Sequence, residues 1–374
     1  MINFGKKVTI IFKPTFNCNL NCSYCYERNQ NHNYIMPKEQ MIQIIQTLLD
    51  TCENTLSIIW HGGEPTVVGL DYFKDVINHF KFTNRITWNV QSNGILLDDD
   101  WLQFYKENNI QISTSWDGIN NDMFRGRNNF IRLVKLAKKY EIPVHAIMTV
   151  TPQNAKDVMD TWTIATELNV GVMFNAAFGI GTNEIEAAQI AKSLNEVFDR
   201  MCITENAHII RPFDDVLNYL IGTPGFWCET INCTEAWFGV WPNGDVYPCA
   251  KPWGQGMKCG NLLTDNPEEV LSKTNPVKQR LLEVRLQQMS DCKNCDYLLS
   301  CYGKCPYTGF RSDNSYQKDE AQCVFNKEIF NGCLDIIEQR LLNNSLINWE
   351  VIDAVRNSTK TRFIKWKNYK SPLT

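Results

Sequence analysis

Three features are missing from this chain of 374 residues, and each absence excludes a class of protein. No run of 18 or more apolar residues occurs, so no segment is predicted to span a membrane. The formal net charge is −4, without the basic excess that is typical of nucleic-acid-binding domains. The first apolar run, VTIIF, ends at Lys13 and Pro14 and predicts a strand, not a secretory signal. We therefore expect a cytoplasmic protein that has neither nucleic-acid nor membrane partners.

Cysteine, in contrast, is abundant, with fifteen residues. In a small secreted protein this number would predict a disulfide framework. This chain is long and groups its cysteines in CxxC-like spacings, a pattern that favours metal ligation in an intracellular protein. We expect most of the cysteines to bind metal. Cys52 and Cys202 lie in helical patterns and are predicted to be small buried hydrophobic residues.

The first two hundred residues alternate between two patterns. Short runs rich in β-branched and aromatic residues predict strands at 8–12, 56–60, 85–90, 110–116, 144–150 and 171–178. Stretches with helical spacing lie at 37–52, 69–80, 98–109, 128–140, 154–169 and 183–201. Six strand–helix pairs predict a parallel sheet with right-handed crossovers. Because a closed barrel needs eight pairs, we expect an α/β fold with an open, partial (β/α)6 barrel related to the TIM barrel.

The pattern changes near residue 221. We assign 1–220 to the barrel, 221–345 to a cysteine-rich domain that folds around metal, and 346–374 to a basic, aromatic tail. Within the second domain, long regular helices are not expected before 326–342. The tail is expected to be a solvated or loosely docked terminus, with a surface for an acidic peptide as the alternative.

Unusual sequences follow five of the predicted strands: FNCNLNCSYC, HGGEPT, QSNG, DGINNDMFRGR and TPQN. In α/β barrels these loops share one face, and that face holds the active site. Five such loops on one rim make an enzyme the leading interpretation.

The first of these loops carries Cys18, Cys22 and Cys25. A structural zinc site requires four ligands, so three cysteines would leave it incomplete. Three thiolates on a [4Fe–4S] cluster instead leave one iron open to an outside ligand. With Tyr24 before the last cysteine, the loop resembles the CxxxCxΦC signature of the radical S-adenosylmethionine (SAM) superfamily, in which Φ is aromatic. The resemblance implies a cluster at whose open iron SAM binds.

The other loops extend this resemblance. HGGEP is similar to the family's GGEP motif, which implies that the backbone at Gly62, Gly63 and Glu64 lies against the methionine end of SAM. QSNG resembles QTNG and implies that Asn93 is a polar group on the cofactor rim. In SWDG, Ser115 is implied to contact the SAM ribose or carboxylate, and the Asp117–Gly118 pair is equally consistent with a turn.

An arginine near the same loop is a candidate partner for the SAM carboxylate. Arg125 is the first choice. Because its spacing from Asp117 is shorter than the family pattern, Arg127 is the alternative.

The downstream cysteines resemble the SPASM extension of the same superfamily. The sequence CKNCDYLLSCYGKC and the ten residues between Cys233 and Gly244 match its spacing. The resemblance implies two auxiliary [4Fe–4S] clusters, one held by Cys228, Cys233, Cys249 and Cys305 and the other by Cys292, Cys295, Cys301 and Cys323. Two structural zinc sites are the alternative, since zinc also accepts four thiolates. Cys259 is close enough to Cys249 in sequence to be a substitute ligand.

This resemblance implies an enzyme with SAM and three [4Fe–4S] clusters, supplied by an electron donor such as flavodoxin or ferredoxin. The 5′-deoxyadenosyl radical would abstract a hydrogen atom from a peptide or protein, and the auxiliary clusters would accept the surplus electron. Sulfatase maturases carry an aspartate after the cysteine equivalent to Cys249, thought to be the proton acceptor, where this chain has Ala250. We therefore expect a maturase that forms a cyclophane or thioether crosslink in a ribosomally made precursor peptide. A sulfatase maturase with a displaced base and a non-catalytic zinc-binding protein are the alternatives.

Overall fold

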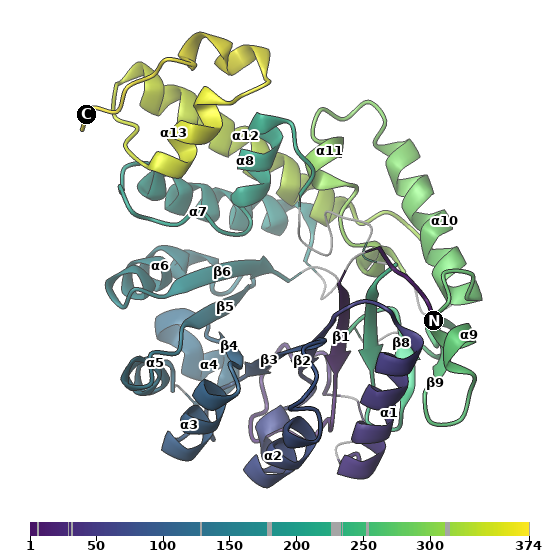
Figure 1. Ribbon diagram of the computed structural model, residues 1–374. Coiled ribbons are helices and arrows are strands. Elements are labelled where there is room, and N and C mark those ends of the chain that lie inside the picture. The colour runs from purple at the N-terminus through teal and green to yellow at the C-terminus, as the bar shows by residue number, and fades with distance from the viewer. Residues whose placement is uncertain are drawn as a thin grey trace.

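The structure is a computed structural model that describes residues 1–373 except 6, 29, 31–32, 128, 178–181, 226–232, 234, 252–253 and 311–314. Its centre is one sheet with the strand order β6-β5-β4-β3-β2-β1-β7-β8-β9 (Figure 1). The first six strands are β1 (Val8–Phe12), β2 (Leu56–Trp60), β3 (Ile86–Ser92), β4 (Gln111–Ser115), β5 (Val144–Val150) and β6 (Gly171–Ala176). They pair in parallel in sequence order. The predicted open barrel is therefore confirmed, because β1 and β6 do not pair to close it.

A helix follows each of these strands, as the apolar periodicity predicts. The helices are α1 (Lys38–Thr51), α2 (Leu70–His79), α3 (Asp99–Glu107), α5 (Phe130–Lys139), α6 (Val158–Glu167) and α7 (Glu184–Cys202), with the short α4 (Asn121–Arg125) before α5. Several have the cap that their sequence predicts: Asp98 accepts from the Trp101 N–H, and Asn183 and Glu186 form a capping box at α7. The loops that leave the carboxyl ends of the strands therefore share one rim.

The sheet continues into the cysteine-rich region, which the sequence did not predict. β7 (Trp237–Val240) pairs in parallel with β1, with Thr9 opposite Trp237. β8 (Asp245–Tyr247) and β9 (Gly260–Asn261) extend it as antiparallel strands. This extension brings the segment around Cys249 next to the strand that leads to the first cysteine loop.

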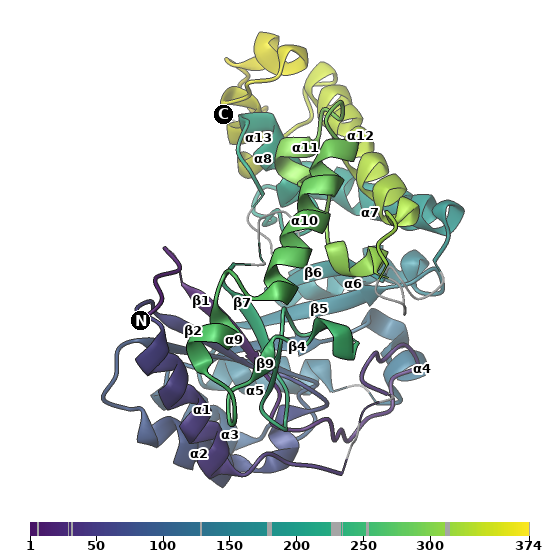
Figure 2. The same cartoon turned by 90° about the vertical axis from the view of Figure 1, so that its right-hand side faces the viewer.

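Most of the remaining helices lie above the sheet, and the helix at Pro267–Leu271 lies beside β9 at its edge (Figures 1 and 2). They are α8 (Asp214–Ile221), α9 (Pro267–Leu271), α10 (Pro276–Asp291), α11 (Leu298–Cys301), α12 (Glu320–Leu342) and α13 (Trp349–Arg356). The expectation that no long regular helix precedes 326–342 was wrong, because α10 has 16 residues. None of the helices in the described ranges is both long and apolar enough to cross a membrane.

The tail after residue 346 is packed, and the expectation of a loose terminus was wrong. Phe363 and Tyr369 are buried, and Arg356 donates to the Tyr369 carbonyl. Arg362 forms ion pairs with Asp335 and Glu338 of α12. The positive charge of Arg362 is thus paired with carboxylates of the same molecule.

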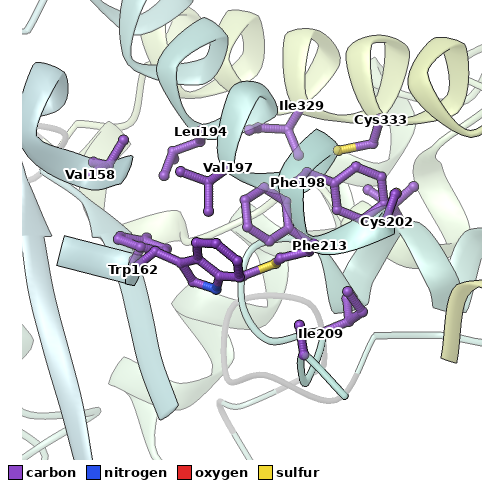
Figure 3. Packing of buried hydrophobic residues seen from close by; sticks show 14 of the residues in the cluster. Val158, Trp162, Leu194, Val197, Phe198, Cys202, Ile209, Phe213, Ile329 and Cys333 are labelled. Atoms are coloured by element: carbon purple, nitrogen blue, oxygen red, sulfur yellow. The ribbon is translucent and has the colours of Figure 1, made fainter. Parts of the chain in front are cut away.

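Two large hydrophobic clusters support the sheet. One joins the barrel strands β1–β4 with α1–α3 and continues into Leu262 and Val270. The other joins β5, β6 and α6 with α7, α8, α12 and α13, so barrel and C-terminal helices share one core (Figure 3). Cys202 and Cys333 are buried in this second cluster, and Cys52 is buried in the first. The predicted hydrophobic role of Cys52 and Cys202 is confirmed.

Candidate active site

The first cysteine loop leaves the carboxyl end of β1. Cys22 is buried and Cys18 and Cys25 are half-buried. The Leu20 N–H lies 3.4 Å from the Cys18 sulfur. Burial raises the pKa of Cys18 to about 11, the Leu20 N–H opposes this rise, and Cys22 and Cys25 add to it. The three thiols therefore lie within electrostatic reach of one another.

The two glycines of HGGEP let the second loop press against this cysteine loop. The N–H groups of Gly63 and Glu64 donate to the carbonyls of Thr15 and Asn17, at 3.1 and 2.8 Å. A Cβ on Gly63 would lie 2.2 Å from the Asn17 oxygen, and one on Gly62 2.4 Å from the Thr15 oxygen. Gly62 also has φ +118°, which favours glycine. The glycines thus allow close approach to the cysteine loop itself, a reason that the sequence analysis did not give.

The Glu64 side chain is a buried carboxylate that joins two loops. It accepts hydrogen bonds from the Thr66 N–H and hydroxyl, at 3.1 and 2.6 Å, from the Ser92 hydroxyl at 2.8 Å and from the Asn93 N–H at 2.7 Å. Burial raises its pKa and these hydrogen bonds oppose the rise. Four donors occupy the carboxylate, so the Glu64 side chain positions the QSNG loop.

Asn93 and Ser115 are the next polar groups on the rim. The Asn93 amide nitrogen donates to the Asn19 side-chain oxygen at 2.7 Å and lies 3.9 Å from the Cys18 sulfur. Ser115 ends β4, is half-buried and accepts from the Gln91 amide at 3.2 Å. The structure therefore brings Asn93 to the cysteine loop. Ser115 lies farther away, because β4 is separated from β1, which leads to that loop, by β3 and β2.

Asp117 is a buried hub rather than only a turn residue. It forms an ion pair with Arg125 at 2.8 Å, accepts from the Tyr24 hydroxyl, and accepts from the Thr149 N–H at 3.2 Å. Arg125 also points a nitrogen at the Cys22 sulfur, 3.9 Å away. Arg127 is exposed. The structure therefore places Arg125, and not Arg127, beside the cysteine loop, with its charge balanced by Asp117.

Lys13 and Glu27 form a buried ion pair that the sequence analysis missed. Lys13 is fully buried at the end of β1, and its ammonium also donates to the Ala250 carbonyl at 2.7 Å. Burial lowers the pKa of Lys13, whereas Glu27 and, more weakly, Cys249 and Cys25 raise it. The ammonium thus lies between the first cysteine loop and the Cys249 segment. A lysine directly after the apolar run VTIIF was the available signal.

The second cysteine group lies where β7 and β8 meet α10. A Cβ on Gly239 would lie 2.3 Å from the Cys249 carbonyl, so β7 packs directly on that residue. Cys249 contributes to raising the pKa of both Cys233 and Cys259, behind burial in each case. Tyr307 lies near both Cys249 and Cys305. Cys228, the fourth ligand that we predicted, lies outside the described residues.

The third group lines a pocket that is partly open to solvent. Its lining includes four cysteines that we predicted to act together: Cys292, Cys295, Cys301 and Cys323. Burial raises the pKa of Cys301 to about 12, opposed by Lys304, and Cys295 and Cys292 add to the rise. A pocket lined by four cysteine side chains fits a thiolate-bound cluster.

The donor chemistry of all three groups is suited to Fe–S clusters, which are bound by cysteine thiolates. Within the described ranges, no three His, Cys, Asp or Glu side chains are placed to hold a single metal ion. The residues that we predict to hold clusters are the three cysteine groups above. Such clusters would supply one-electron chemistry and, at the first loop, an open iron.

Comparison with known proteins agrees with this geometry. Residues 12–165 match the Radical SAM superfamily, and residues 228–296 match the SPASM iron–sulfur cluster-binding domain. The fold and its cysteine-rich loops thus define a radical SAM enzyme with an iron–sulfur domain. The chain belongs to the radical SAM superfamily, in its SPASM-containing group.

Several relatives cover most of the chain. It is 23% identical over 331 residues to the cysteine-type anaerobic sulfatase-maturating enzyme of Clostridium novyi, which covers 80% of this chain and 88% of the relative. It is 26% identical over 353 residues to the serine-type enzyme of Bacteroides thetaiotaomicron, with 82% and 84% covered. An uncharacterized protein of Methanocaldococcus jannaschii is 30% identical over 280 residues, with 69% and 89% covered.

Two kinds of solved structure share the fold. One is anSMEcpe with bound AdoMet and the Cp18Cys peptide, with a TM-score of 0.76, 22% identity and 91% of this chain and 99% of that chain covered. The other is Streptococcus suis SuiB bound to its precursor peptide SuiA, with a TM-score of 0.61, 17% identity and 84% and 76% covered. At these identities the similarity establishes the fold.

Proposed function

We propose that this enzyme is a peptide maturase that forms a crosslink, a carbon–carbon cyclophane or a thioether, in a ribosomally made precursor peptide. SAM and three [4Fe–4S] clusters would supply the radical and electron-transfer chemistry. The first-site contacts are assigned to Tyr24, the Gly62–Glu64 backbone, Asn93, Ser115 and Arg125. Flavodoxin or ferredoxin would donate the electron.

The observation that carries this proposal is the environment of Ala250. The family resemblance implies an aspartate at this position in sulfatase maturases, whereas this chain has Ala250. The Lys13 ammonium donates to the Ala250 carbonyl at 2.7 Å. An alanine side chain cannot accept a proton, so aldehyde formation from Ser or Cys lacks its base at this position. When a crosslink forms, the substrate loses its proton from a different atom. The reaction therefore does not require a carboxylate at position 250.

Tyr24 and Arg125 would position the cofactor through Asp117. The Asp117 carboxylate fixes both the Arg125 guanidinium and the Tyr24 hydroxyl. A second guanidinium nitrogen remains directed at the cysteine loop. A planar guanidinium is suited to a carboxylate such as that of SAM.

Anaerobic reconstitution tests the cofactor set. About twelve iron per chain are expected, since three cubanes hold that many, together with SAM cleavage under dithionite. Cys18→Ala should abolish SAM cleavage and leave the iron of the other two groups largely in place. Colourless protein with stoichiometric zinc would refute the proposal, and retained cleavage in Cys18→Ala would refute the assignment of the first loop.

A sulfatase-maturase function is the second candidate, because two named relatives that cover most of this chain are such enzymes. The two functions give different products. A peptide from a short open reading frame beside the gene should lose hydrogen without gaining an aldehyde if crosslinking is correct. An aldehyde trapped by a hydrazide probe, in a peptide from a neighbouring sulfatase gene, would establish the second candidate instead.

A further inference from the structure

Helix α10 has an unusual buried face. Its buried residues include Lys278, Leu281, Arg285 and Gln288, which recur at intervals of three and four and therefore share one side of the helix. Lys278 is 3% exposed and Arg285 is 1% exposed. Fully buried lysine and arginine are rare unless an anion accompanies them.

The contacts of Lys278 are with uncharged groups. Its ammonium donates to the Trp237 carbonyl at 2.8 Å and lies 3.8 Å from the centre of the Phe238 ring. Among the residues that the structure describes, no carboxylate forms an ion pair with it. Burial lowers the pKa of Lys278 to about 8, and the cysteines at 259, 233 and 249 oppose this change. The side chains of these three cysteines and, more weakly, Glu235 therefore lie within electrostatic reach of this cation.

Arg285 faces the same cysteines. It hydrogen-bonds the Cys233 side chain and donates to the Tyr302 carbonyl at 3.0 Å and to the Lys304 carbonyl, just before Cys305. Burial raises the pKa of Cys233, and both Arg285 and Lys278 oppose the rise. Two buried cations on one helix face are thus directed at one cysteine group.

The other cysteine group has a different charge environment. Lys304 also lines the cavity of Cys292, Cys295, Cys301 and Cys323, but its ammonium forms an ion pair with buried Asp215 at 3.0 Å. Lys318, at the same cavity, is paired with Glu320 at 3.3 Å. Cations that are neutralised by carboxylates contribute little net field.

We propose that Lys278 and Arg285 are the built-in counter-charge of the cluster at Cys233, Cys249 and Cys305, and that they raise its reduction potential above that of the cluster at Cys292, Cys295, Cys301 and Cys323. The inference rests on the proposed function in taking both groups to hold Fe–S clusters. A thiolate-bound cluster is an anion that gains negative charge on reduction, so nearby cations and hydrogen bonds to sulfur favour the reduced form. The cluster beside α10 is then the better electron acceptor and lies on the side of the molecule nearer Ala250.

The test is a redox titration followed by electron paramagnetic resonance. The full-length reconstituted enzyme carries Cys18→Ala so that the two auxiliary signals are observed, and Cys323→Ala identifies which signal belongs to which group. Lys278→Met should lower the reduced-to-oxidised ratio of the α10-side cluster about tenfold at a fixed potential, which is a shift of about 59 mV for one electron. The other cluster should not shift. Lys278→Arg, which keeps the charge, and exposed Lys273→Met should both match the parent.

Two titrating clusters that do not respond to Lys278→Met, or a shift of the other cluster, would overturn this inference alone. Colourless, zinc-loaded parent protein would overturn it together with the proposed function. If Lys278→Met fails to hold one cluster, the iron content of Lys278→Arg decides the result: restored iron supports a counter-charge, and unrestored iron overturns it.

Discussion

Asp117 connects more parts of the first site than any cysteine does. Its carboxylate contacts Tyr24 of the cysteine loop, Arg125 of α4 and the Thr149 N–H of β5. The sequence showed only an Asp–Gly pair after a strand, which is as consistent with a turn. The hydrogen bonds of Asp117 with Tyr24 and Thr149 join distant parts of the chain and are not recoverable from local spacing. The CxxxCxxC motif is recoverable, because one short loop contains it.

Asp117→Asn should be strongly destabilising. It leaves the Arg125 guanidinium, 9% exposed, without its anion, and breaking one side of a buried pair typically costs about 3–5 kcal/mol. Unfolding of the anaerobic, cluster-loaded enzyme in guanidinium chloride measures the change in the free energy of unfolding. Adding Arg125→Met to Asp117→Asn should recover part of the loss, because it removes the stranded charge. Exposed Arg127→Met is the control, and an unchanged midpoint in Asp117→Asn would contradict the ion pair.

His61 predicts a pH dependence of stability. Burial, with Lys13 and Lys251, lowers the pKa of this histidine to about 3, and its Nδ1 accepts from the Gly62 N–H at 2.7 Å. Because the folded pKa lies below the unfolded value of about 6.5, the unfolded chain binds the extra proton between these two values. The contribution of neutral His61 to the free energy of unfolding is therefore fully present above pH 6.5. It is lost as the pH falls, at up to about 1.4 kcal/mol per pH unit.

His61→Asn, which keeps an acceptor for Gly62, should flatten the loss of stability between pH 7.5 and about 5.5. Denaturant unfolding of the cluster-loaded enzyme at several pH values measures this slope. Exposed His79→Asn should keep the parental slope. Parallel curves for His61→Asn and the parent would show that His61 is not the group responsible.

At the scale of elements, the strand–helix alternation was predictable because the barrel strands lie in runs rich in β-branched and aromatic residues and each following helix has an apolar face. Helix α10 was missed for a physical reason: its buried face carries Lys278, Arg285 and Gln288, so it lacks the apolar periodicity of a core helix. Strands β7–β9 were missed because they have two to four residues. β7 pairs with β1, more than two hundred residues away in the sequence, and β8 and β9 are added to β7 in turn.

The contact between the first two loops gives a prediction for an element. Gly63→Ala places a Cβ 2.2 Å from the carbonyl oxygens of Phe16 and Asn17, so the backbone must shift. We expect the first cluster to be lost or loosened, with SAM cleavage reduced at least about tenfold, as one ångström of misplacement commonly costs more. Gly171→Ala is the matched control, because its Cβ would meet only the His145 ring at 3.5 Å.

Iron content and SAM cleavage per chain measure the outcome. Normal iron at the first site with normal cleavage in Gly63→Ala would contradict the close packing of the two loops. A similar loss in Gly171→Ala would show that the barrel is sensitive to any added methyl group.

For the molecule as a whole, the apolar core is divided unequally. The two large clusters reach from the barrel into β7, β8, Leu262, Val270 and the C-terminal helices, including Phe198 and Cys333 (Figure 3). The third contains six buried residues: Phe16, Trp241, Tyr247, Met257, Val277 and Leu281. The folding of residues 276–310 therefore depends least on apolar burial. Cysteines and charged residues contribute much of the surface that this segment buries. The sequence predicted metal-dependent folding for all of 221–345, whereas from the packing we expect that dependence in a smaller part.

Removal of the clusters should therefore unfold one segment and leave the rest. In enzyme treated anaerobically with a chelator, hydrogen exchange is expected to rise in 276–310. Without the clusters, the cysteine side chains and the cations of α10 are no longer held together. Peptides from β1–β6 and from α12 beyond its first turn should keep their protection, since they belong to the large apolar clusters. Hydrogen exchange followed by mass spectrometry, with reconstituted enzyme as the reference, measures both regions at once. Equal protection in the two states would show that 276–310 folds without metal, and loss across all peptides would show that the barrel also depends on its clusters.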